Sequence, residues 1–325
     1  MNPLARALEL AERGRGTTRP NPIVGAVVVA DGEVVGEGWH ERPGGPHAEI
    51  VALEAAGERA RGATLYTTLE PCAHHGRTAP CVPAIVGAGI RRVVTAAVDP
   101  NPRVDGLGLT ALREAGLGVE VADGELAARA RRQNEAFRTW VRLGRPFVTY
   151  KAAMTLDGRL AASGGESRWI SGEESRRLVH ELRAASDAVA VGAGTARADE
   201  PRLTARDVGA SRQPRRLAFG RALPGGSELE LRTGPLEDEL AQLGSEGVQS
   251  LLLEGGPTIA GEFLRRGLID KLVLFVAPKL LGGDDAPPLF GGPGARSLAE
   301  ATSLSGFETA RAGQDLVITA YVHEP

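Results

Sequence analysis

Two cysteines, one histidine and one glutamate carry the clearest chemistry in the sequence. Both cysteines of the 325-residue chain, Cys72 and Cys81, lie in the stretch PCAHHGRTAPC at residues 71–81, and His47 follows a glycine-rich turn upstream. One imidazole and two thiolates fill three positions of a tetrahedral zinc ion and leave the fourth open, which is how catalytic rather than structural zinc is held. The pattern therefore predicts a catalytic metal site with His47, Cys72 and Cys81 as ligands.

Glu49, two residues after His47, suits a task that no metal ligand can perform. Its carboxylate can take a proton from a metal-activated water and deliver it to a ring nitrogen and a leaving amine. Each piece alone has a simpler interpretation, because a cysteine pair can be two buried apolar side chains and a His-x-Glu sequence arises by chance. The order and spacing of all the pieces favour the metal site.

Composition limits the class of protein. The formal net charge of −3 and the pI near 6.1 predict no basic surface for nucleic acid or for an anionic membrane. The longest apolar run near the N-terminus, Ile23 to Ala30, is too short to span a membrane, and residues 1–10 resemble a short amphipathic helix rather than a signal peptide. We therefore expect a cytoplasmic protein without a membrane or nucleic-acid partner, in which a disulfide is disfavoured.

The first half of the chain alternates strands with helices. Strands are predicted at 23–29, 33–38, 63–69, 92–98 and 119–121, and helices at 47–56, 81–87, 104–117 and 125–141. This alternation predicts a mostly parallel α/β sheet covered by helices. In such a sheet the carboxyl ends of neighbouring strands meet at one edge, so the segments that carry His47 and Cys72 can converge there.

The second half begins after glycine and proline interrupt the pattern at residues 143–146, which predicts domains at 1–144 and 145–325. Strands are predicted at 147–154, 188–191, 248–253 and 272–277, and Ser171 to Glu174 is interpreted as a capping box that opens a helix. Glycine-rich turns at 192–195 and 254–258 offer backbone amides to a phosphate. Residues 204–247 give only weak signals.

The first half resembles the cytidine-deaminase-like superfamily, on the residues His47-Ala48-Glu49, Pro71-Cys72 and Cys81. The resemblance implies an α/β/α sandwich, and the long gap between the cysteines is similar to that of the riboflavin-pathway pyrimidine deaminase. It further implies that Asn21 of a Pro-Asn-Pro turn and His40 of a Gly-Trp-His run face the pyrimidine. His74, with His75 and Arg77, would belong to a loop that touches the substrate, the alternative being a solvated loop.

The second half resembles the riboflavin-pathway reductase domain, which is similar to dihydrofolate reductase and uses NADPH. The resemblance rests on YKAAMTLDG at 150–158, GESRWIS at 165–171, VGAGT at 191–195, DEPRLTAR at 199–206 and LEGGP at 253–257. The cofactor residues that it implies are Ala153, Trp169, Thr195, Asp199, Gly256, Pro257 and Thr258. The substrate residues that it implies are Ser167, Arg183, Leu203, Arg206 and Glu254, with the arginines facing a phosphate. Asp157 is interpreted as a turn residue.

Lys151 is placed with the substrate residues. Of the 38 basic residues only three are lysines, and Lys151 lies at the start of a reductase motif, where a compact point charge differs from the planar fork of arginine. Two other features depart from the family pattern. Residues 217–247 are fewer than expected, which predicts a missing or rebuilt element near the adenosine end of the cofactor. Leu107 occupies a position that is commonly basic, which argues against a phosphate contact there.

Together these features predict a bifunctional enzyme of riboflavin biosynthesis. The first domain, with one Zn²⁺, would hydrolyse the 2-amino group of 2,5-diamino-6-(5-phosphoribosylamino)pyrimidin-4-one, and the second would use NADPH to reduce the ribosyl side chain of the product to ribityl. The alternatives are a deaminase of tRNA or DNA, which the acidic charge disfavours, and a zinc-binding module without activity, which would not need Glu49. A homo-oligomer formed through the reductase domain is compatible with the resemblance.

Overall fold

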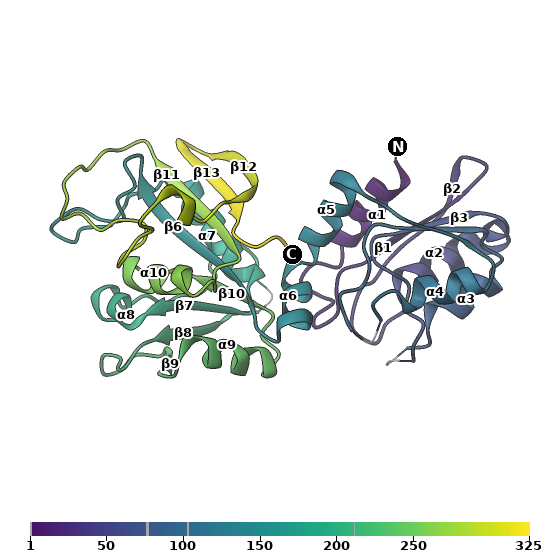
Figure 1. The fold of residues 1–325 in the computed structure, drawn as a ribbon, viewed down its shortest axis with the longest axis horizontal. Helices are drawn as coiled ribbons and strands as arrows, with labels where there is room; N and C mark the ends of the chain where they lie inside the picture. Colours follow the sequence, from purple (N-terminus) through teal and green to yellow (C-terminus); the bar gives the residue numbers. More distant parts are fainter. Residues whose placement is uncertain (1, 76–77, 103, 211) are drawn as a thin grey trace. The chain divides into compact units, whose positions relative to one another are not determined.

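The computed structural model describes residues 2–325 except 76–77, 103 and 211. The chain divides into two compact units, one that ends at Leu143 and one that runs from Gly144 to Glu324. This division lies one residue before the boundary expected from the sequence. Each unit contains its own sheet and its own core, and each is described separately (Figure 1).

A five-stranded sheet with the order β2-β1-β3-β4-β5 forms the centre of the first unit. Its strands are β1 (Gly25–Ala30), β2 (Glu33–Trp39), β3 (Thr64–Thr67), β4 (Arg92–Thr95) and β5 (Gly118–Val121). Four of the five strands run in the same direction, in agreement with the expectation of a mostly parallel sheet. Strand β1 alone is reversed, because it pairs antiparallel with both of its neighbours, whereas β3, β4 and β5 pair in parallel. The hairpin turn at Asp31-Gly32 reverses the chain, with positive φ at both residues. Since β1 is antiparallel to both β2 and β3, those two strands run in the same direction and their carboxyl ends share one edge.

Helices cover both faces of this sheet, as expected for an α/β/α sandwich. They are α1 (Pro3–Glu12), α2 (Ala48–Ala56), α3 (Cys81–Gly87), α4 (Leu107–Glu114), α5 (Gly124–Gln133) and α6 (Glu135–Leu143), with a 3₁₀ turn at Gly57–Ala60. Leu4 and Leu8 of α1 pack with Ala130 of α5 in one cluster. The helices α2, α3 and α4 share a second cluster around Leu65 of β3 and Ile85 of α3.

The single helix predicted at 125–141 is broken in the structure. Asn134 separates α5 from α6, and its buried carboxamide accepts a hydrogen bond from the Ile23 N–H and donates one to the Ile23 carbonyl, both at 2.9 Å. These two bonds replace backbone pairing that a strand would otherwise supply to Ile23. The long-range contact therefore stops the helix and fixes the segment that follows Asn21.

Close packing fixes the start of α2 on the sheet. A Cβ atom added to Gly38 of β2 would lie 2.5 Å from the carbonyl oxygen of Ala48, and one added to Gly36 would overlap the carbonyl oxygen of Ala52. Only glycine allows the helix backbone to approach the strand this closely. The contact matters because Ala48 lies between His47 and Glu49.

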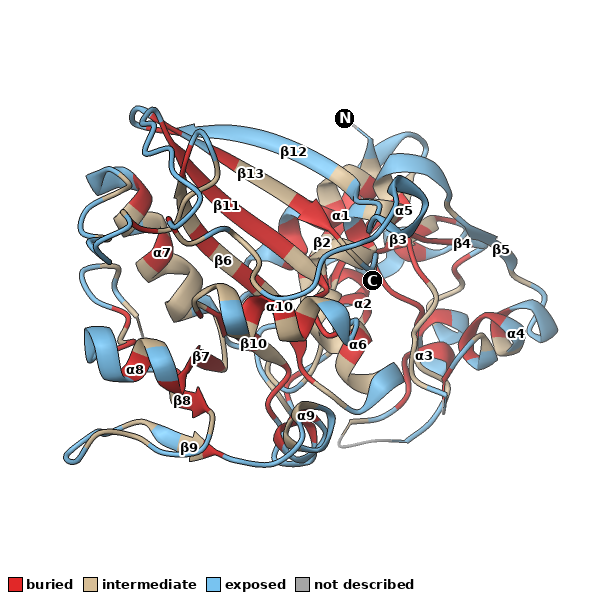
Figure 2. Ribbon diagram, turned by 60° about the vertical axis from the view of Figure 1, so that its left-hand side comes forward, coloured by how far each residue is buried: buried red, intermediate tan, exposed pale blue. Residues whose placement is uncertain are grey.

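The second unit contains an eight-stranded sheet with the order β12-β13-β11-β6-β10-β7-β8-β9. Its strands are β6 (Phe147–Thr155), β7 (Ala188–Gly192), β8 (Arg215–Phe219), β9 (Glu230–Arg232), β10 (Ser250–Leu253), β11 (Lys271–Ala277), β12 (Ser305–Ala312) and β13 (Asp315–Tyr321). All pairings from β11 to β9 are parallel, and the β12–β13 hairpin adds an antiparallel edge. Figure 2 shows the buried central strands and the exposed edge strand β12.

The helices of this unit pack against its sheet. They are α7 (Glu173–Ala185), α8 (Ala193–Asp199), α9 (Leu236–Ser245) and α10 (Pro257–Arg265), with a 3₁₀ turn at Leu298–Glu300. Leu240 of α9 and Phe263 of α10 pack into the largest core cluster, whereas Val179 of α7 packs into a separate cluster with Phe275. The core of this domain is therefore layered, with helices on both faces of the sheet.

The start of α7 differs from the predicted capping box. Gly172, not Ser171, is the N-cap, and it has no side chain to offer. Instead the buried carboxylate of Asp315 accepts hydrogen bonds from the Gly172 N–H at 2.7 Å and from the Ser175 hydroxyl at 2.5 Å. An acid at a helix N-terminus is stabilised by the helix dipole, whichever strand supplies it.

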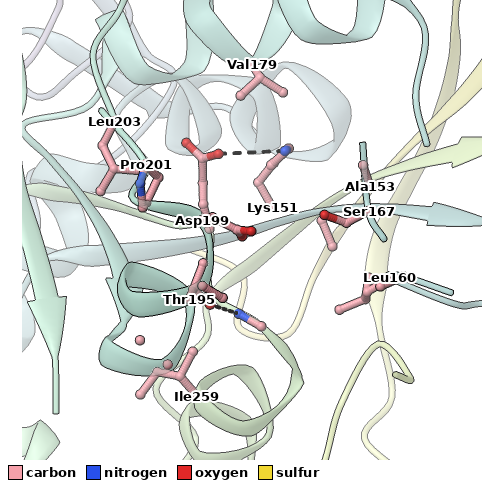
Figure 3. Close-up of a pocket in the computed structure, with 18 of the residues that line it drawn as sticks. Lys151, Ala153, Leu160, Ser167, Val179, Thr195, Asp199, Pro201, Leu203 and Ile259 are labelled. Carbon is pink, nitrogen blue, oxygen red and sulfur yellow. Dashed lines mark hydrogen bonds and ion pairs between the residues drawn. The ribbon is translucent and has the colours of Figure 1, made fainter. Parts of the chain in front are cut away.

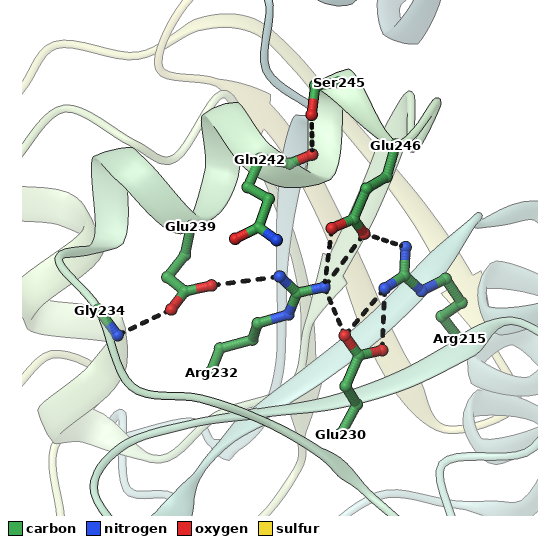
Figure 4. A network of polar contacts seen from close by, with 8 residues as sticks. All are labelled: Arg215, Glu230, Arg232, Gly234, Glu239, Gln242, Ser245 and Glu246. Atoms are coloured by element: carbon green, nitrogen blue, oxygen red, sulfur yellow. Dashed lines mark hydrogen bonds and ion pairs between the residues drawn. The ribbon is translucent and has the colours of Figure 1, made fainter.

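Residues 217–247, where a rebuilt element was expected, form β9 and α9 around a buried arginine (Figure 4). Arg232 of β9 bonds to Glu230, to Glu239 at 3.3 Å and to Glu246 at 3.1 Å. Arg215 of β8 bonds to Glu230 and Glu246 as well. These shared carboxylates join the three-residue edge strand to β8 and α9.

None of the helices that the structure describes combines the length and the apolar character needed to cross a bilayer.

Candidate active sites

Three ligand atoms meet at the carboxyl edge of the first sheet. The His47 Nδ1 atom lies 3.2 Å from the Cys81 Sγ atom and 3.5 Å from the Cys72 Sγ atom, and the two sulfurs are 3.7 Å apart. Both cysteines are free, since this separation far exceeds the roughly 2.05 Å of a disulfide. The structure therefore brings together all three predicted ligands.

The spacing of these atoms fits a zinc ion. Bond lengths of about 2.3 Å to sulfur and about 2.0–2.1 Å to nitrogen, at tetrahedral angles, place two sulfurs about 3.8 Å apart and a sulfur and a nitrogen about 3.6 Å apart. The observed distances of 3.7, 3.5 and 3.2 Å match this geometry before any ion is considered. Among the described residues, His47, Cys72 and Cys81 form the group of three His, Cys, Asp or Glu side chains whose ligand atoms lie close enough to one another to hold a metal ion.

Each ligand comes from the end of a secondary-structure element. His47 is the N-cap of α2, Cys81 is the first residue of α3, and Cys72 lies in the loop after β3. The Cys81 N–H donates to the Cys72 carbonyl oxygen at 3.0 Å and lies 3.4 Å from the Cys72 sulfur, which fastens the loop to α3. Thr78 bonds to the Nε2 atom of His47 at 3.0 Å and fixes the orientation of its ring.

The electrostatics of the site favour a thiolate. Hydrogen bonding from the Cys81 thiol, against the effect of burial and with help from His47, lowers the pKa of Cys72 to about 4. The same bond and burial raise the pKa of the Cys81 thiol, so Cys81 keeps its proton until a cation replaces it. Hydrogen bonding to Cys72 likewise raises the pKa of His47. Metal binding here would therefore displace protons from His47 and Cys81, whereas Cys72 is already a thiolate.

Glu49 is buried beside the ligands, in the first turn of α2. Burial raises the pKa of its carboxyl to about 7, and the nearby charge of His47 opposes the rise. A carboxyl with a pKa near the working pH can both accept and give a proton. Its position and its chemistry are those of a general acid and base.

Asn21 contacts His40, and the His40 ring lies near the proposed ligand His47, with ring centroids 5.4 Å apart. The His40 Nδ1 atom lies 3.0 Å from the Pro46 carbonyl oxygen, which can only accept, so this nitrogen carries the proton. The other nitrogen, Nε2, then accepts from the Asn21 side-chain amide at 3.1 Å. This chain of bonds leaves the Asn21 carboxamide oxygen as the acceptor for a ligand.

His74 lies apart from the three ligand residues. His74 is exposed and lies near Asp99, whose pKa is raised to about 6 mainly by burial and lowered in part by the His74 charge. The structure does not place His74 against the metal ligands. Arg77, expected in the same loop, lies outside the described residues.

Sequence reasoning missed Glu70, which organises the neighbouring loop. Its buried carboxylate accepts hydrogen bonds from the backbone N–H groups of Asp99, Gly106, Gly108 and Leu109, at 2.8–3.3 Å. A Cβ atom at Gly108 would overlap the Pro71 carbonyl oxygen, so this glycine allows the loop to lie against the segment that precedes Cys72. The exposed Leu107 offers no charge there, in agreement with the departure noted in the sequence. The position of Glu70 directly before Pro71-Cys72 was the available signal.

The second unit contains one pocket of about 2420 Å³ that gathers the residues predicted for the reductase (Figure 3). A single ligand typically occupies about 300–1,000 Å³, so the volume accommodates a dinucleotide and a substrate together. The predicted cofactor and substrate residues all line it, namely Lys151, Ala153, Ser167, Trp169, Arg183, Thr195, Asp199, Leu203, Arg206, Glu254, Gly256, Pro257 and Thr258.

A group of partly buried charges lines this pocket. Arg183 donates to both carboxylate oxygens of Glu254, at 2.6 and 2.9 Å, and the Lys151 Nζ atom lies 3.7 Å from the same carboxylate. Burial lowers the pKa of Lys151, although the charge of Glu254 opposes it. Burial alone would raise the pKa of Glu254, but the charges of Lys151 and Arg183 outweigh it and keep the carboxyl ionised.

Arg183 and Arg206 both line the pocket, and they differ in how firmly the protein holds them. Three of the five N–H donors of Arg183 are directed at the protein, two at the Glu254 oxygens and one at the Thr204 carbonyl at 3.2 Å. Arg206 is exposed, and its one side-chain hydrogen bond among the described residues goes to the Thr204 hydroxyl, at 2.8 Å. Arg206 therefore has the larger number of donors left for a ligand.

The two glycine-rich segments differ from each other. The turn at 254–256 leads into α10 as predicted, with Gly256 as N-cap, and the Gly256 N–H donates to the Thr195 hydroxyl at 3.2 Å. The stretch at 192–195 is not an open turn, because α8 already begins at Ala193. Both segments still end adjacent parallel strands and face the same pocket.

Local backbone features agree with a functional site. Leu203 is buried with a φ of 53°, a strained conformation for a leucine that commonly marks a functional position.

Trp169 is exposed, its carbonyl oxygen accepts a hydrogen bond from Lys279 at 2.8 Å, and the guanidinium of Arg176 stacks on its ring. Asp157 accepts from the backbone of Leu281 and Gly282, which confirms its interpretation as a turn residue. Pro287 and Arg221 also line the pocket, and no motif pointed to either.

Comparison with known proteins agrees with both sites. Residues 2–97 match the family model "Cytidine and deoxycytidylate deaminase zinc-binding region", and residues 146–318 match "RibD C-terminal domain". The chain is 41% identical to the riboflavin biosynthesis protein RibD of Escherichia coli, over 97% of each chain, and 42% identical to that of Aquifex aeolicus, over 98% of this chain and 97% of the other.

Solved structures give the same result. A RibD structure from Acinetobacter baumannii is 37% identical with a TM-score of 0.86, and a diaminohydroxyphosphoribosylaminopyrimidine deaminase/5-amino-6-(5-phosphoribosylamino)uracil reductase from Thermotoga maritima is 35% identical with a TM-score of 0.83. Each match covers 98% of this chain and 97% of the other. With both domains matched over nearly their whole length, the chain belongs to the RibD family of bifunctional riboflavin biosynthesis enzymes, with a zinc-binding deaminase domain followed by a reductase domain.

Proposed function

We propose that the first site hydrolyses the 2-amino group of 2,5-diamino-6-(5-phosphoribosylamino)pyrimidin-4-one and that the second reduces the ribosyl group of the product with NADPH. The observation that carries the first assignment is the triangle of one nitrogen and two sulfurs with zinc-like spacing, next to a buried carboxyl. The observation that supports the second is the pocket large enough for two ligands, which a partly buried lysine and glutamate line.

In the deaminase site, His47, Cys72 and Cys81 would hold the zinc, which lowers the pKa of water and so supplies the nucleophile. Glu49 accepts a proton as the water attacks the carbon that carries the amino group, and it delivers protons to the ring nitrogen and to the leaving amine. One water is consumed and one ammonia is released. Burial of Glu49 keeps this proton transfer away from bulk solvent.

The orientation of the pyrimidine follows from Asn21. Because His40 accepts from the amide nitrogen of Asn21, the carboxamide oxygen is directed to a donor on the ligand. An amino or ring N–H group of the pyrimidine provides that donor. Asn134 supports this arrangement, since it fixes the backbone of Ile23 two residues away.

In the reductase site, Lys151 and Glu254 act on the ribosyl group. Reduction of the sugar to its open-chain alcohol consumes one hydride, supplied by the nicotinamide, and one proton at oxygen. Lys151 can give that proton, because burial lowers its pKa and Glu254 orients its ammonium group. Arg183 holds Glu254 in place, and Arg206 faces the substrate phosphate.

Assays with the full chain test both assignments. Purified protein should release ammonia from the diaminopyrimidine without NADPH, and it should oxidise NADPH only when the deaminated product is present or has been formed. Ammonia release that required NADPH, or NADPH oxidation by the undeaminated substrate at an equal rate, would contradict the proposed order.

Two further features belong to this proposal. The free thiols fit a reducing compartment such as the cytoplasm, with a small phosphorylated pyrimidine rather than nucleic acid as the partner.

The edge strand β12 exposes Phe307, with Leu304 and Leu316 nearby, and an exposed apolar edge is a surface for pairing with a second copy of the reductase domain. Sedimentation of the chain should give a dimer or larger, and a monomer at micromolar concentration would exclude this association.

A further inference from the structure

The strand order fixes which end of the reductase pocket receives the adenosine of the cofactor. Lys151 and Ala153 lie on β6, and the strands that follow across the sheet are β10, β7 and β8. A dinucleotide that starts with its nicotinamide beside β6 crosses the glycine-rich ends of β10 and β7. Its far end therefore reaches the carboxyl end of β8.

The segment β7–α8–β8 has the arrangement in which parallel α/β folds distinguish the two nicotinamide cofactors. In such a unit the glycine-rich end of the first strand lies against the pyrophosphate of the cofactor, and a residue after the second strand contacts the adenosine ribose. An acidic residue at that position binds the free ribose hydroxyls of NADH, whereas an arginine accommodates the 2′-phosphate of NADPH. Here β7 ends at Gly192 and runs parallel to β8, which ends at Phe219. The residues that follow β8 are Gly220 and Arg221.

Gly220 brings this strand end against α8. Its φ is 149°, and a Cβ atom at this position would lie 2.5 Å from the Cβ atom of Ala193, the first residue of α8. Only glycine permits this approach. Phe219, Gly220 and Arg221 all line the pocket as a result, together with Thr195 of α8.

Two guanidinium groups belong to this end of the pocket. Arg197, one helical turn from Ala193, lines the pocket and donates to the Ala222 carbonyl oxygen at 3.2 Å, which fastens the turn that carries Arg221. The exposed Arg221 side chain forms no hydrogen bond or ion pair with any residue that the structure describes. Neither arginine is paired with a carboxylate in that part of the chain, unlike Arg265 on the α10 side, which is paired with Glu262 at 2.8 Å.

The strand edge beneath this turn is held firmly. Arg215 of β8 is tied to Glu230 of β9 and to Glu246 after α9, so the end of β8 is supported from its outer side (Figure 4). This network stands where the sequence predicted a rebuilt adenosine end. A supported strand end with an unpaired guanidinium is suited to bind a phosphate through charge-assisted hydrogen bonds.

We propose that Arg221 binds the 2′-phosphate on the adenosine ribose of NADPH and thereby sets the preference of the reductase domain for NADPH over NADH, with Arg197 positioning its turn. The inference rests on the proposed reductase function, and it adds the residue that selects the cofactor. It predicts that the phosphate, rather than the nicotinamide, is what Arg221 recognises.

Equilibrium binding to the full-length chain tests this directly. Calorimetry measures the binding of four ligands: NADPH, NADH, 2′,5′-ADP and 5′-ADP. Each is titrated into wild type, Arg221→Gln and the control Arg216→Gln. The control removes an arginine of β8 that pairs with Glu228 outside the pocket. Glutamine cannot form the charge-assisted hydrogen bonds of a guanidinium, so Arg221→Gln should bind NADPH and 2′,5′-ADP about tenfold to a hundredfold more weakly. NADH and 5′-ADP should bind Arg221→Gln and wild type equally, and Arg216→Gln should resemble wild type with all four.

The possible failures are distinguishable. If Arg221→Gln binds NADPH as tightly as wild type does, or loses NADH and NADPH in the same proportion, Arg221 does not read the 2′-phosphate and the inference is wrong. If wild type binds neither dinucleotide, the proposed reductase function fails first and the inference fails with it. Unchanged binding of NADH by each variant reports that the reductase domain is folded.

Discussion

Replacing Glu49 with Gln should abolish ammonia release while zinc stays bound. Glutamine keeps the size of the side chain but cannot accept the proton of the attacking water, and proton transfer by a positioned group contributes roughly 10²–10⁴-fold to a rate. Glu49 is buried in the first turn of α2 and its carboxyl has a pKa of about 7, so no other group in the described part of the site combines this position with this basicity. We expect kcat for deamination to fall by about 10²–10⁴, measured as ammonia release under saturating substrate.

A matched control lies on the same helix. Glu54 is exposed near the end of α2, so Glu54→Gln changes the same charge without reaching the site and should deaminate like wild type. NADPH oxidation with the deaminated substrate should be unchanged in both variants. Equal ammonia release by Glu49→Gln and wild type, with zinc retained, would show that another group transfers the proton and that the chemistry assigned to this site is wrong.

Replacing Lys151 with Met should nearly abolish the reductase while leaving the deaminase intact. Methionine fills similar space but offers no proton to the sugar oxygen and leaves the Glu254 carboxylate with only Arg183 as its partner. Loss of a general acid again predicts a fall of about 10²–10⁴ in turnover, measured as oxidation of NADPH with the deaminated substrate. NADPH itself should bind normally, because its proposed contacts lie on other residues.

The small number of lysines supplies the control for this variant. Lys271 lies on β11 and contacts the ring of Tyr321 rather than the pocket, so Lys271→Met should keep both activities. A Lys151→Met enzyme that retains more than about a tenth of the wild-type turnover would exclude proton donation by Lys151, since a general acid contributes at least about a hundredfold. A loss of NADPH binding instead would move Lys151 from the substrate to the cofactor.

The sequence predicted the chemistry of both sites better than their surroundings. His47, Glu49, Cys72 and Cys81 were found because each chemical role demands a residue type that few alternatives can fill, and the structure brings the three ligands within 3.7 Å of one another. The reductase residues were predicted from a resemblance to a known domain, and all of them line one pocket. Local patterns suffice where function depends on residue identity at the end of an element.

What the sequence could not predict depends on interactions between distant segments. The break between α5 and α6 arises because Asn134 bonds to Ile23, 111 residues earlier, and nothing in the local helical pattern reveals that partner. The cap of α7 comes from Asp315 on β13, 140 residues after Ser175, and a local capping motif cannot reveal it. The partner of Arg183, Glu254, lies after another strand, so the sequence pattern gives no sign of the ion pair that holds this guanidinium.

The edges of the second sheet were missed for a similar reason. The strands β8 and β9 carry several charged residues, and β9 is held by ion pairs of Arg232 with glutamates rather than by an apolar pattern. Strand β12 is exposed along most of its length and so lacks the alternation that marks a half-buried strand. In the first sheet the reversed strand β1 lies between β2 and β3, and this strand order depends on long-range pairing that the local pattern does not give.

The central claim is that His47, Cys72 and Cys81 hold one catalytic zinc, and metal analysis of the purified full-length chain tests it most directly. A site with three protein ligands predicts about one zinc per chain in wild type and in Glu49→Gln, and almost none in Cys72→Ser, because a serine hydroxyl replaces a thiolate. NADPH oxidation by Cys72→Ser should persist, since that pocket lies in the other domain. Wild-type protein that releases ammonia without bound metal, or a Cys72→Ser variant that keeps its zinc, would contradict the account.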